Sequence, residues 1–296
     1  MGCMMMAHFH HPIYNIMHLK RWLTAIAALP FLFWVILKGG HLLFAALIVI
    51  VAILSLGEYF RIALNDSVKT KAPTSKAQSP NRFYLKISAF IIGPVIILAA
   101  FNNLFDVIIA LVVLDLIISS LYLLRKFRSD PLALEAIARQ VIGIIYIPLF
   151  LSCLVLIRNG SDGVKWVFFL LLLVFACDTG AYYIGTYMGR RKLCPSISPG
   201  KTVEGSIGGI AASLGAGLIF KNFFLPQMPW GSIMLFCLSI AVVGQVGDLF
   251  ESALKRSANV KDSGAILPGH GGILDRIDAL LFAAPVAFFF KEYLLV

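Results

Sequence analysis

The chain has 296 residues, of which 59% are hydrophobic and 14% are charged. Its mean hydropathy of +0.89 is far above that of a soluble globular domain, so the composition excludes the soluble classes and predicts a membrane protein. The formal net charge of +10 falls in polar segments between apolar runs. Because the sequence offers no soluble basic domain to carry this charge, it indicates contact with anionic lipid headgroups and disfavours nucleic acid as a partner.

Apolar runs of roughly 17 to 25 residues, the length that crosses a bilayer, follow one another along the chain. They cover residues 22–37, 41–60, 84–101, 104–124, 140–157, 165–187, 205–224, 230–249 and 274–293. We therefore predict an all-α integral membrane protein, a polytopic helical bundle with about nine transmembrane helices.

The runs divide into two regions. Residues 1–160 are predicted to form an N-terminal transmembrane region of about five helices, with cytoplasmic loops at 61–83 and 125–139, the second of which carries a short interfacial helix. Residues 161–296 form a C-terminal region of about four helices that carries the motifs described below. In the first region Asp115 stands deep in an apolar run. Such a carboxylate is a functional candidate, but with no partner motif around it we expect a buried, hydrogen-bonded residue.

The distribution of basic residues predicts the orientation. With nine spans, twenty of the 25 Lys and Arg residues fall on the side of the amino terminus and the even-numbered loops. Five fall on the other side: Lys38, Arg158, Lys165, Lys221 and Lys291. By the positive-inside rule, the amino terminus and the even-numbered loops are cytoplasmic.

Charged residues are concentrated between residues 247 and 278. The acidic ones are Asp248, Glu251, Asp262, Asp275 and Asp278, and the basic ones are Lys255, Arg256, Lys261 and Arg276. If the preceding helix continues, Asp248, Glu251 and Lys255 share one of its faces, and the two last aspartates share a face at the start of the next helix. The sequence therefore predicts that two acidic helix ends meet at the membrane boundary.

A glycine-rich loop, residues 267–272, separates these helix ends. Its glycines permit positive φ values and the close backbone approach that a bound anion or nucleotide requires. Paired carboxylates that meet phosphate oxygens are typical of Mg²⁺ sites, while lysine and arginine clamp the phosphates. We expect one or two divalent ions, with a monovalent ion as a further option.

A second constellation lies between residues 175 and 192. Asp178 interrupts an apolar helix and is expected to face a polar cavity, because a charge inside a span is costly elsewhere. Ala181, Gly185 and Gly189 follow at a spacing of four and predict a surface on which another helix packs closely.

A third constellation begins at Ser198. Gly200, Lys201 and Thr202 suggest a P-loop, but Pro195 stands where that motif requires glycine, so we reject it. We expect a cytoplasmic loop in which Ser198 and Lys201 meet phosphate. It leads into a helix whose small residues, Gly205, Gly209, Ser213 and Gly217, again predict close packing. By the parity of the spans, this loop and the 247–278 segment open on the same side and can build one site.

Several of these runs together carry a family signature. They are Ser252-Ala-Leu-Lys255-Arg256, Lys261-Asp262-Ser263-Gly264 and Leu267-Pro-Gly-His270-Gly271-Gly272-Ile-Leu-Asp275-Arg276-Ile-Asp278, with Gly247-Asp248-Leu249, Glu251 and Asp178-Thr-Gly-Ala-Tyr182. They resemble the signature of phosphatidate cytidylyltransferases, also called CDP-diacylglycerol synthases. The resemblance covers the last third of the chain, whereas residues 1–160 match only as apolar spans. The chain departs from the family at Gly200, where a lysine is common, and at Val203, where a tryptophan is common.

The resemblance implies a Mg²⁺-dependent enzyme of phospholipid biosynthesis. Such an enzyme joins CTP and phosphatidic acid, a membrane lipid, to give CDP-diacylglycerol and pyrophosphate. It also implies a homodimer in the bacterial inner membrane, with the active site facing the cytoplasm.

The expected site residues fall into three groups. Catalytic roles are expected for Asp248, Asp275, Lys255, Arg256, Lys261 and His270. Substrate binding is expected for Asp178, Ser198, Lys201, Arg276, Gly271 and Gly272. The metal ligands are expected among Asp248, Asp275, Glu251 and Asp278, the first two being the ones that the resemblance favours. For His270, a hydrogen bond to the leaving group and a purely loop-structuring role are equally open.

Other functions remain open at this point. A CTP-dependent lipid kinase, or a cytidylyltransferase for another lipid phosphate, would need the same metal and phosphate clamp. A secondary transporter would use Asp115 and Asp178 as ion-pathway residues, but it predicts inverted repeats between the two halves of the chain, and we find none.

Overall fold

The computed structural model describes residues 29–64, 83–128, 132–266 and 271–295. After a short apolar helix at Leu29–Lys38, the chain consists mainly of helices. They are α2 (Gly40–Ala63), α3 (Phe83–Phe101), α4 (Phe105–Lys126), α5 (Ala133–Ile144), the π-helical turn η2 (Ile145–Leu149), α6 (Phe150–Asn159), α7 (Gly163–Met188), α8 (Val203–Phe224), α9 (Trp230–Ser257), α10 (Leu274–Phe289) and η3 (Phe290–Leu294). The two strands are β1 (Lys192–Cys194) and β2 (Ser198–Thr202).

The prediction of a polytopic helical bundle is confirmed. Within the described ranges, seven helical segments are long and apolar enough to cross a membrane, with α5, η2 and α6 forming one continuous segment. The short helix at Leu29–Lys38 and α10 account for the first and last predicted runs, which makes about nine apolar helices in all. The chain is therefore a multi-pass membrane protein.

The short helix expected in the connection at 125–139 is present, but it is continuous with the next span. α4 extends to Lys126, and α5 already begins at Ala133. The reason is that α5 is amphipathic and buries one face, including Ile137 and Gln140, against the bundle. A π-helical turn around Pro148, which has no backbone N–H to donate, then leads into α6. The loop expected at 61–83 falls mostly on residues 65–82, which lie outside the described residues.

The segment after α7 contains strands that we did not expect. β1 and β2 pair in antiparallel fashion, with Lys192 opposite Thr202 and Cys194 opposite Ser198. Pro195 and Pro199 disfavour a helix in this segment, and the turn at residues 195–197 brings the two short strands together. This hairpin replaces the irregular loop that the sequence suggested.

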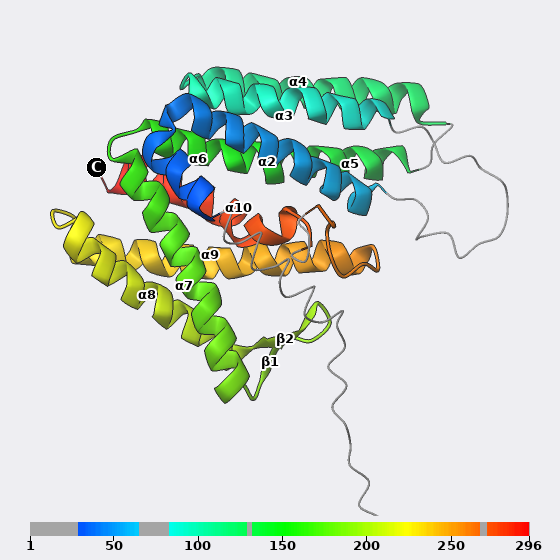
Figure 1. Cartoon of the computed structure of the whole chain (residues 1–296). Coiled ribbons are helices and arrows are strands. Elements are labelled where there is room, and N and C mark those ends of the chain that lie inside the picture. The colour runs from blue at the N-terminus through cyan, green and yellow to red at the C-terminus, as the bar shows by residue number, and fades with distance from the viewer. Residues whose placement is uncertain (1–28, 65–82, 129–131, 267–270, 296) are drawn as a thin grey trace, which may run out of the picture.

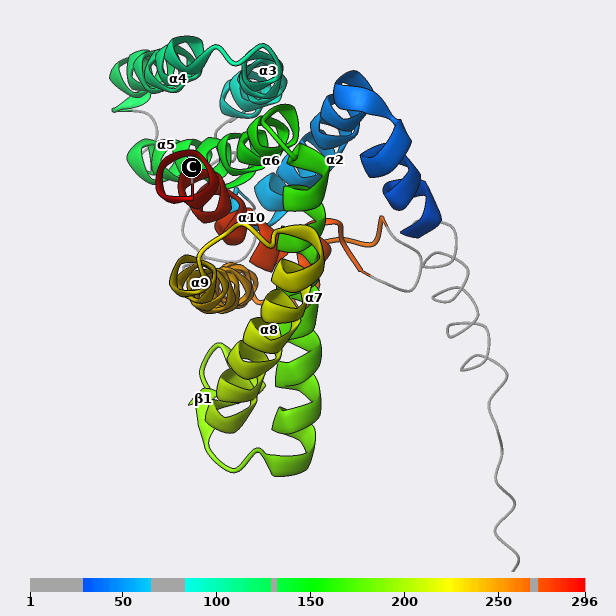
Figure 2. The same cartoon turned by 90° about the vertical axis from the view of Figure 1, so that its left-hand side faces the viewer.

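The helices form an elongated bundle from which one part projects (Figure 1). α3 and α4 lie side by side along one edge, α2, α5 and α6 come next, and α10 and α9 follow. α7 crosses the bundle at a steep angle, and its second half extends beyond the other helices together with α8 and the hairpin (Figure 2). This projecting part and α9 frame the site described below.

The predicted close packing of small residues is confirmed between α7 and α8, the helix pair with the most extensive contact. A Cβ atom at Gly209 would lie 2.7 Å from the backbone oxygen of Cys177 and 3.1 Å from the Cβ of Ala181. At Gly205 it would lie 2.8 Å from the backbone oxygen of Ala181. Only glycine allows the two backbones to approach so closely.

The expectation for Asp115 is also confirmed. This residue is 1% exposed, and its Oδ1 accepts a hydrogen bond of 2.7 Å from Nε2 of Gln140 in α5. Ser119, one turn further along α4, donates to Oε1 of the same glutamine at 2.9 Å. α4 buries few residues, among them Ile108, so these polar contacts contribute much of its attachment to the bundle.

Arginine side chains tie segments together at both ends of the bundle. At one end Arg61 donates to the backbone oxygen of Ser263, and Nε of Arg256 donates to the hairpin turn at 3.2 Å. At the opposite end Nη2 of Arg158 donates to the backbone oxygen of Ile36 at 3.1 Å. The segments that the parity of the spans assigned to one side therefore meet in space.

Candidate active site

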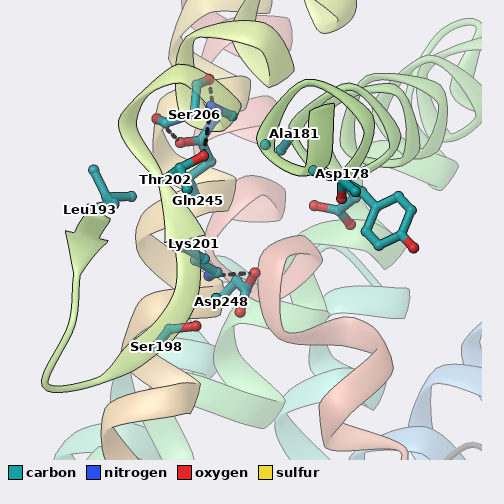
Figure 3. A pocket seen from close by; sticks show the side chains of 14 residues that line it. Asp178, Ala181, Leu193, Ser198, Lys201, Thr202, Ser206, Gln245 and Asp248 are labelled. Carbon is teal, nitrogen blue, oxygen red and sulfur yellow. Dashed lines mark hydrogen bonds and ion pairs between the residues drawn. The ribbon is translucent and has the colours of Figure 1, made fainter. Parts of the chain in front are cut away.

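A cavity of about 470 Å³ opens between α7, the hairpin, α8 and α9. α7 contributes Asp178 and Tyr182 to its wall, β2 contributes Ser198 and Lys201, and α9 contributes Asp248 (Figure 3). The predicted polar cavity next to Asp178 is thus present. It brings the second and third sequence constellations together with the start of the 247–278 segment.

Lys201 and Asp248 form an ion pair across this cavity. Nζ of the lysine lies 2.6 Å from Oδ2 of the aspartate, and the two side chains are 27% and 31% exposed (Figure 3). Their partial exposure leaves both groups accessible to a ligand that enters the cavity. This contact shows that the two segments meet in space; that they form one functional site stays a prediction.

The hairpin is held in place by local contacts that follow from its sequence. Thr202 is the N-cap of α8, and its side chain accepts a hydrogen bond of 3.1 Å from the backbone N–H of Gly205. Glu204 accepts from the backbone N–H groups of Arg190 at 3.0 Å and Arg191 at 3.1 Å. Lys201, which directly precedes the cap, is therefore carried on a fixed piece of backbone.

A second ion-pair cluster lies beside the cavity, where α9 meets α10. Nζ of Lys255 lies 2.5 Å from Oε2 of Glu251 and 2.7 Å from Oδ1 of Asp275. The three side chains are 13%, 1% and 8% exposed. Because a buried polar or charged group is costly unless it is paired, each of the three side chains offsets part of the cost of burying the others.

Asp275 is also bound by the backbone of the signature segment. The backbone N–H of Ser263 donates to its Oδ2 at 3.0 Å, and the N–H of Gly272 donates to the same atom at 2.9 Å. Gly271 has a φ of +85°, a left-handed conformation that favours glycine and that places these donors around the carboxylate. Asp275 therefore organises the loop that leads into its own helix.

Glu58 of α2 is a residue of the site that the sequence analysis missed. Its carboxylate accepts hydrogen bonds from the backbone N–H groups of Ile273 at 3.1 Å and Leu274 at 2.8 Å, and from the hydroxyl of Ser263 at 3.1 Å. The signal available in the sequence was a carboxylate near the end of an apolar run. A charged residue inside a membrane span is costly, which makes it a functional candidate.

Negative charge accumulates around Asp248. Asp178 and Asp278 both lie within electrostatic range of it, and α9 and α10 approach so closely that a Cβ at Gly247 would lie 2.7 Å from the backbone oxygen of Asp278. Among the residues that the structure describes, no three His, Cys, Asp or Glu side chains form a group that could hold a metal ion by itself. A cation at this position would need oxygen atoms from a ligand or from water.

The remaining predicted residues are placed as follows. Arg256, Lys261 and Arg276 are exposed near the two clusters. Gly272 is buried and its N–H is donated to Asp275, so a role for this N–H in substrate binding would require that bond to be exchanged. His270 lies outside the described residues. The individual roles of all these residues stay predictions.

Comparison with known proteins identifies the family. Residues 19–294 match the cytidylyltransferase family. A protein of Bacillus subtilis (strain 168) named phosphatidate cytidylyltransferase is 47% identical over 146 residues, which are 49% of this chain and 54% of that protein. A protein of the same name from Staphylococcus epidermidis (strain ATCC 35984) is 39% identical over 180 residues, which are 60% of this chain and 66% of that protein. The aligned segments thus span less than two thirds of these relatives. Since the family match extends over nearly all of the described helices, the chain belongs to the cytidylyltransferase family.

Proposed function

We propose that the protein is a CTP:phosphatidate cytidylyltransferase, which makes CDP-diacylglycerol and pyrophosphate from CTP and phosphatidic acid. One observation carries this proposal: two lysine–carboxylate pairs, Lys201–Asp248 and Lys255–Asp275, lie at the same end of an apolar helical bundle. The lysine ammonium groups can bind phosphate, and the carboxylates can bind a cation. Both therefore lie where a lipid phosphate and a nucleotide can reach them. The names of the relatives from Bacillus and Staphylococcus support the same substrates.

The reaction suits a site without a serine or cysteine nucleophile. An oxygen of the phosphatidate phosphate attacks the α-phosphorus of CTP and forms a new P–O bond. The bond from that phosphorus to the oxygen bridging it to the β-phosphate breaks, and pyrophosphate leaves with the electron pair. Because the nucleophile is already an anion, the protein's task is to align two polyanions and to stabilise the leaving group.

The chain's own residues can perform this alignment. Lys201 and Ser198, on β2, line the cavity and would bind phosphate oxygens there, with Lys201 exchanging its contact with Asp248 for the substrate. Lys255, which is buried against Asp275, would add positive charge that stabilises the leaving group. Arg256, Lys261 and Arg276 would extend this positive electrostatic potential towards the exposed surface.

We further propose Mg²⁺ as the cofactor, with Asp248 and Asp275 as its principal ligands and Glu251 and Asp278 nearby. Two observations support this proposal: Asp178 and Asp278 lie within electrostatic range of Asp248, and two lysines pair with Asp248, Glu251 and Asp275. Mg²⁺ prefers one or two carboxylates completed by water and substrate phosphates, so a ready-made three-residue cage is not required. When bound, the ion would neutralise charge on the departing pyrophosphate.

We infer an orientation with this end of the bundle in the cytoplasm of a bacterial cell. Twenty of the 25 basic residues fall on that side, which is the arrangement that the positive-inside rule describes. A homodimer is a further part of the proposal. Broad exposed apolar faces, such as that of α4, are available to lipid or to a second copy, and the mass of the protein in detergent would decide the oligomeric state.

The test is an assay that follows each part of CTP. Purified protein in detergent is incubated with phosphatidate, Mg²⁺ and CTP labelled at the α- or γ-phosphate. Transfer of the α label into lipid, with release of pyrophosphate, is the expected result. Transfer of the γ label would establish a lipid kinase and reject the proposal, as would the absence of any labelled lipid from an otherwise folded protein.

A further inference from the structure

Glu58 lies far from the signature in sequence but against it in space. It is 3% exposed, and its carboxylate faces the start of α10, where it accepts from the N–H groups of Ile273 and Leu274. The first N–H groups of a helix have no partner inside that helix, and a negative charge there is favourable. Glu58 of α2 therefore completes the first turn of α10.

Two signature glycines leave room for this carboxylate. A Cβ atom at Gly264 would collide with Oε1 of Glu58, and a Cβ atom at Gly272 would lie 2.5 Å from its Oε2. The backbone of the signature segment is thus fitted around an anion that the chain itself supplies. Arg61, one turn further along α2, donates to the backbone oxygen of Ser263 and adds a second attachment.

The residues that Glu58 holds are the ones that hold Asp275. Glu58 accepts from the hydroxyl of Ser263 at 3.1 Å, while the N–H of the same serine donates to Asp275 at 3.0 Å. Glu58 also binds the N–H of Leu274, the immediate neighbour of Asp275. A shift of the Glu58 carboxylate would therefore move both segments that surround Asp275.

We propose that Glu58 is a positioning residue for the transfer reaction, which fixes Asp275 against Lys255 by bonding both the Ser263 loop and the first turn of α10. The inference rests on the proposed function. Glu58 is buried and both of its oxygens are occupied by hydrogen bonds within the chain, so it acts through Asp275 and not by touching substrate. Its role resembles that of groups that orient metal ligands in other enzymes.

The first test is the kinetics of Glu58→Gln, which keeps the size of the side chain and removes its charge. We expect kcat to fall by about 10- to 100-fold, with a smaller change in KM for CTP and a higher Mg²⁺ concentration at half-maximal rate. Asp115→Asn is the matched control: it neutralises another buried carboxylate of the N-terminal half, one that bonds Gln140, and it should leave all three quantities unchanged. Equal kinetics for Glu58→Gln and the wild type would overturn the proposal.

The second test does not depend on activity. Hydrogen exchange is followed by mass spectrometry in detergent, in peptides that contain Ser263 and residues 271–275. Glu58→Gln should raise exchange in these peptides, whereas Asp115→Asn should not, and exchange equal to the wild type would overturn the inference. If the wild type transfers no cytidylyl group, the proposed function fails, but the exchange result still decides whether Glu58 holds this segment.

A milder variant covers the case in which Glu58→Gln does not fold. Ser263→Ala removes one hydroxyl donor to Glu58 and leaves the backbone N–H that binds Asp275. We expect a loss of about three- to tenfold in kcat and a smaller rise in exchange at residues 271–275. Wild-type kinetics and exchange in this variant would count against the proposal.

Discussion

The ammonium group of Lys255 lies 2.7 Å from Oδ1 of Asp275 and thereby joins the last turns of α9 to the first turn of α10. The same group lies 2.5 Å from Glu251, so one buried cation is shared by two carboxylates. Such clusters add little net stability, but they specify the relative position of the elements that carry them. In this chain, the elements are the two helices that bear the signature.

Asp275→Asn should abolish turnover while the protein still folds and inserts into the membrane. Asparagine keeps the size and the acceptor oxygen of the side chain but lacks the charge that pairs with Lys255 and that would bind Mg²⁺. We expect a loss of about 100-fold or more in cytidylyl transfer. The rate would be measured in detergent beside Asp115→Asn, whose rate should stay close to that of the wild type. Retained activity in Asp275→Asn would remove this residue from the proposed metal site.

Lys255→Met should destabilise the protein as well as inactivate it. It leaves Glu251 and Asp275 facing each other in a buried position without a cation, and breaking a buried pair in this way costs about 3 to 5 kcal/mol. The double variant Lys255→Met/Asp275→Asn should recover part of that loss, because it removes a carboxylate that has lost its cation. Thermal unfolding in detergent measures both effects. Additive losses would show that the two residues are not coupled.

Lys201→Met should act differently, because the Lys201–Asp248 pair is about 30% exposed and open to the cavity. Partly exposed ion pairs contribute about 1 kcal/mol or less, so the unfolding temperature should hardly change. The loss of a phosphate contact should lower kcat/KM for CTP or phosphatidate by about 10- to 100-fold. Lys192→Met makes the same change at an exposed position of the same hairpin and serves as the control. Equal kcat/KM values in the two variants would contradict the assignment.

Much of the architecture was predictable because it follows from local pattern. The apolar runs became helices where the structure describes them, and the spacing of small residues predicted a surface for close packing on α7 and on α8. The parity of the spans also placed the segments that carry Lys201 and Asp248 on one side, where the structure joins them by an ion pair that was not itself predicted. These inferences use only hydropathy and spacing, which the sequence contains directly.

The parts that were missed depend on contacts between distant residues. Glu58 and Leu274 are 216 positions apart, and no motif around Glu58 indicates its partner. A short helix was expected between residues 125 and 139, but its continuity with the next span was missed, because the segment around Glu135 reads as polar and basic until the buried face of the helix is known. The hairpin was missed because strands this short carry almost no alternation of apolar and polar residues.

The contact between α7 and α8 gives the last prediction. Gly209→Val should destabilise the protein by about 1 to 3 kcal/mol, because a Cβ at this position would lie 2.7 Å from the backbone oxygen of Cys177 and the helices would have to separate. Since α7 and α8 both line the cavity, activity should fall with stability.

Gly215→Val is the matched control for this change. It makes the same substitution on the same helix, at an exposed position where a Cβ would meet no atom within 4 Å. Both variants lose the same glycine flexibility and gain the same side chain, so the difference in their unfolding temperatures reports helix packing alone. If the two variants unfold at the same temperature, the approach of α7 and α8 at Gly209 does not limit stability, and the projecting wall of the cavity must be held by other contacts.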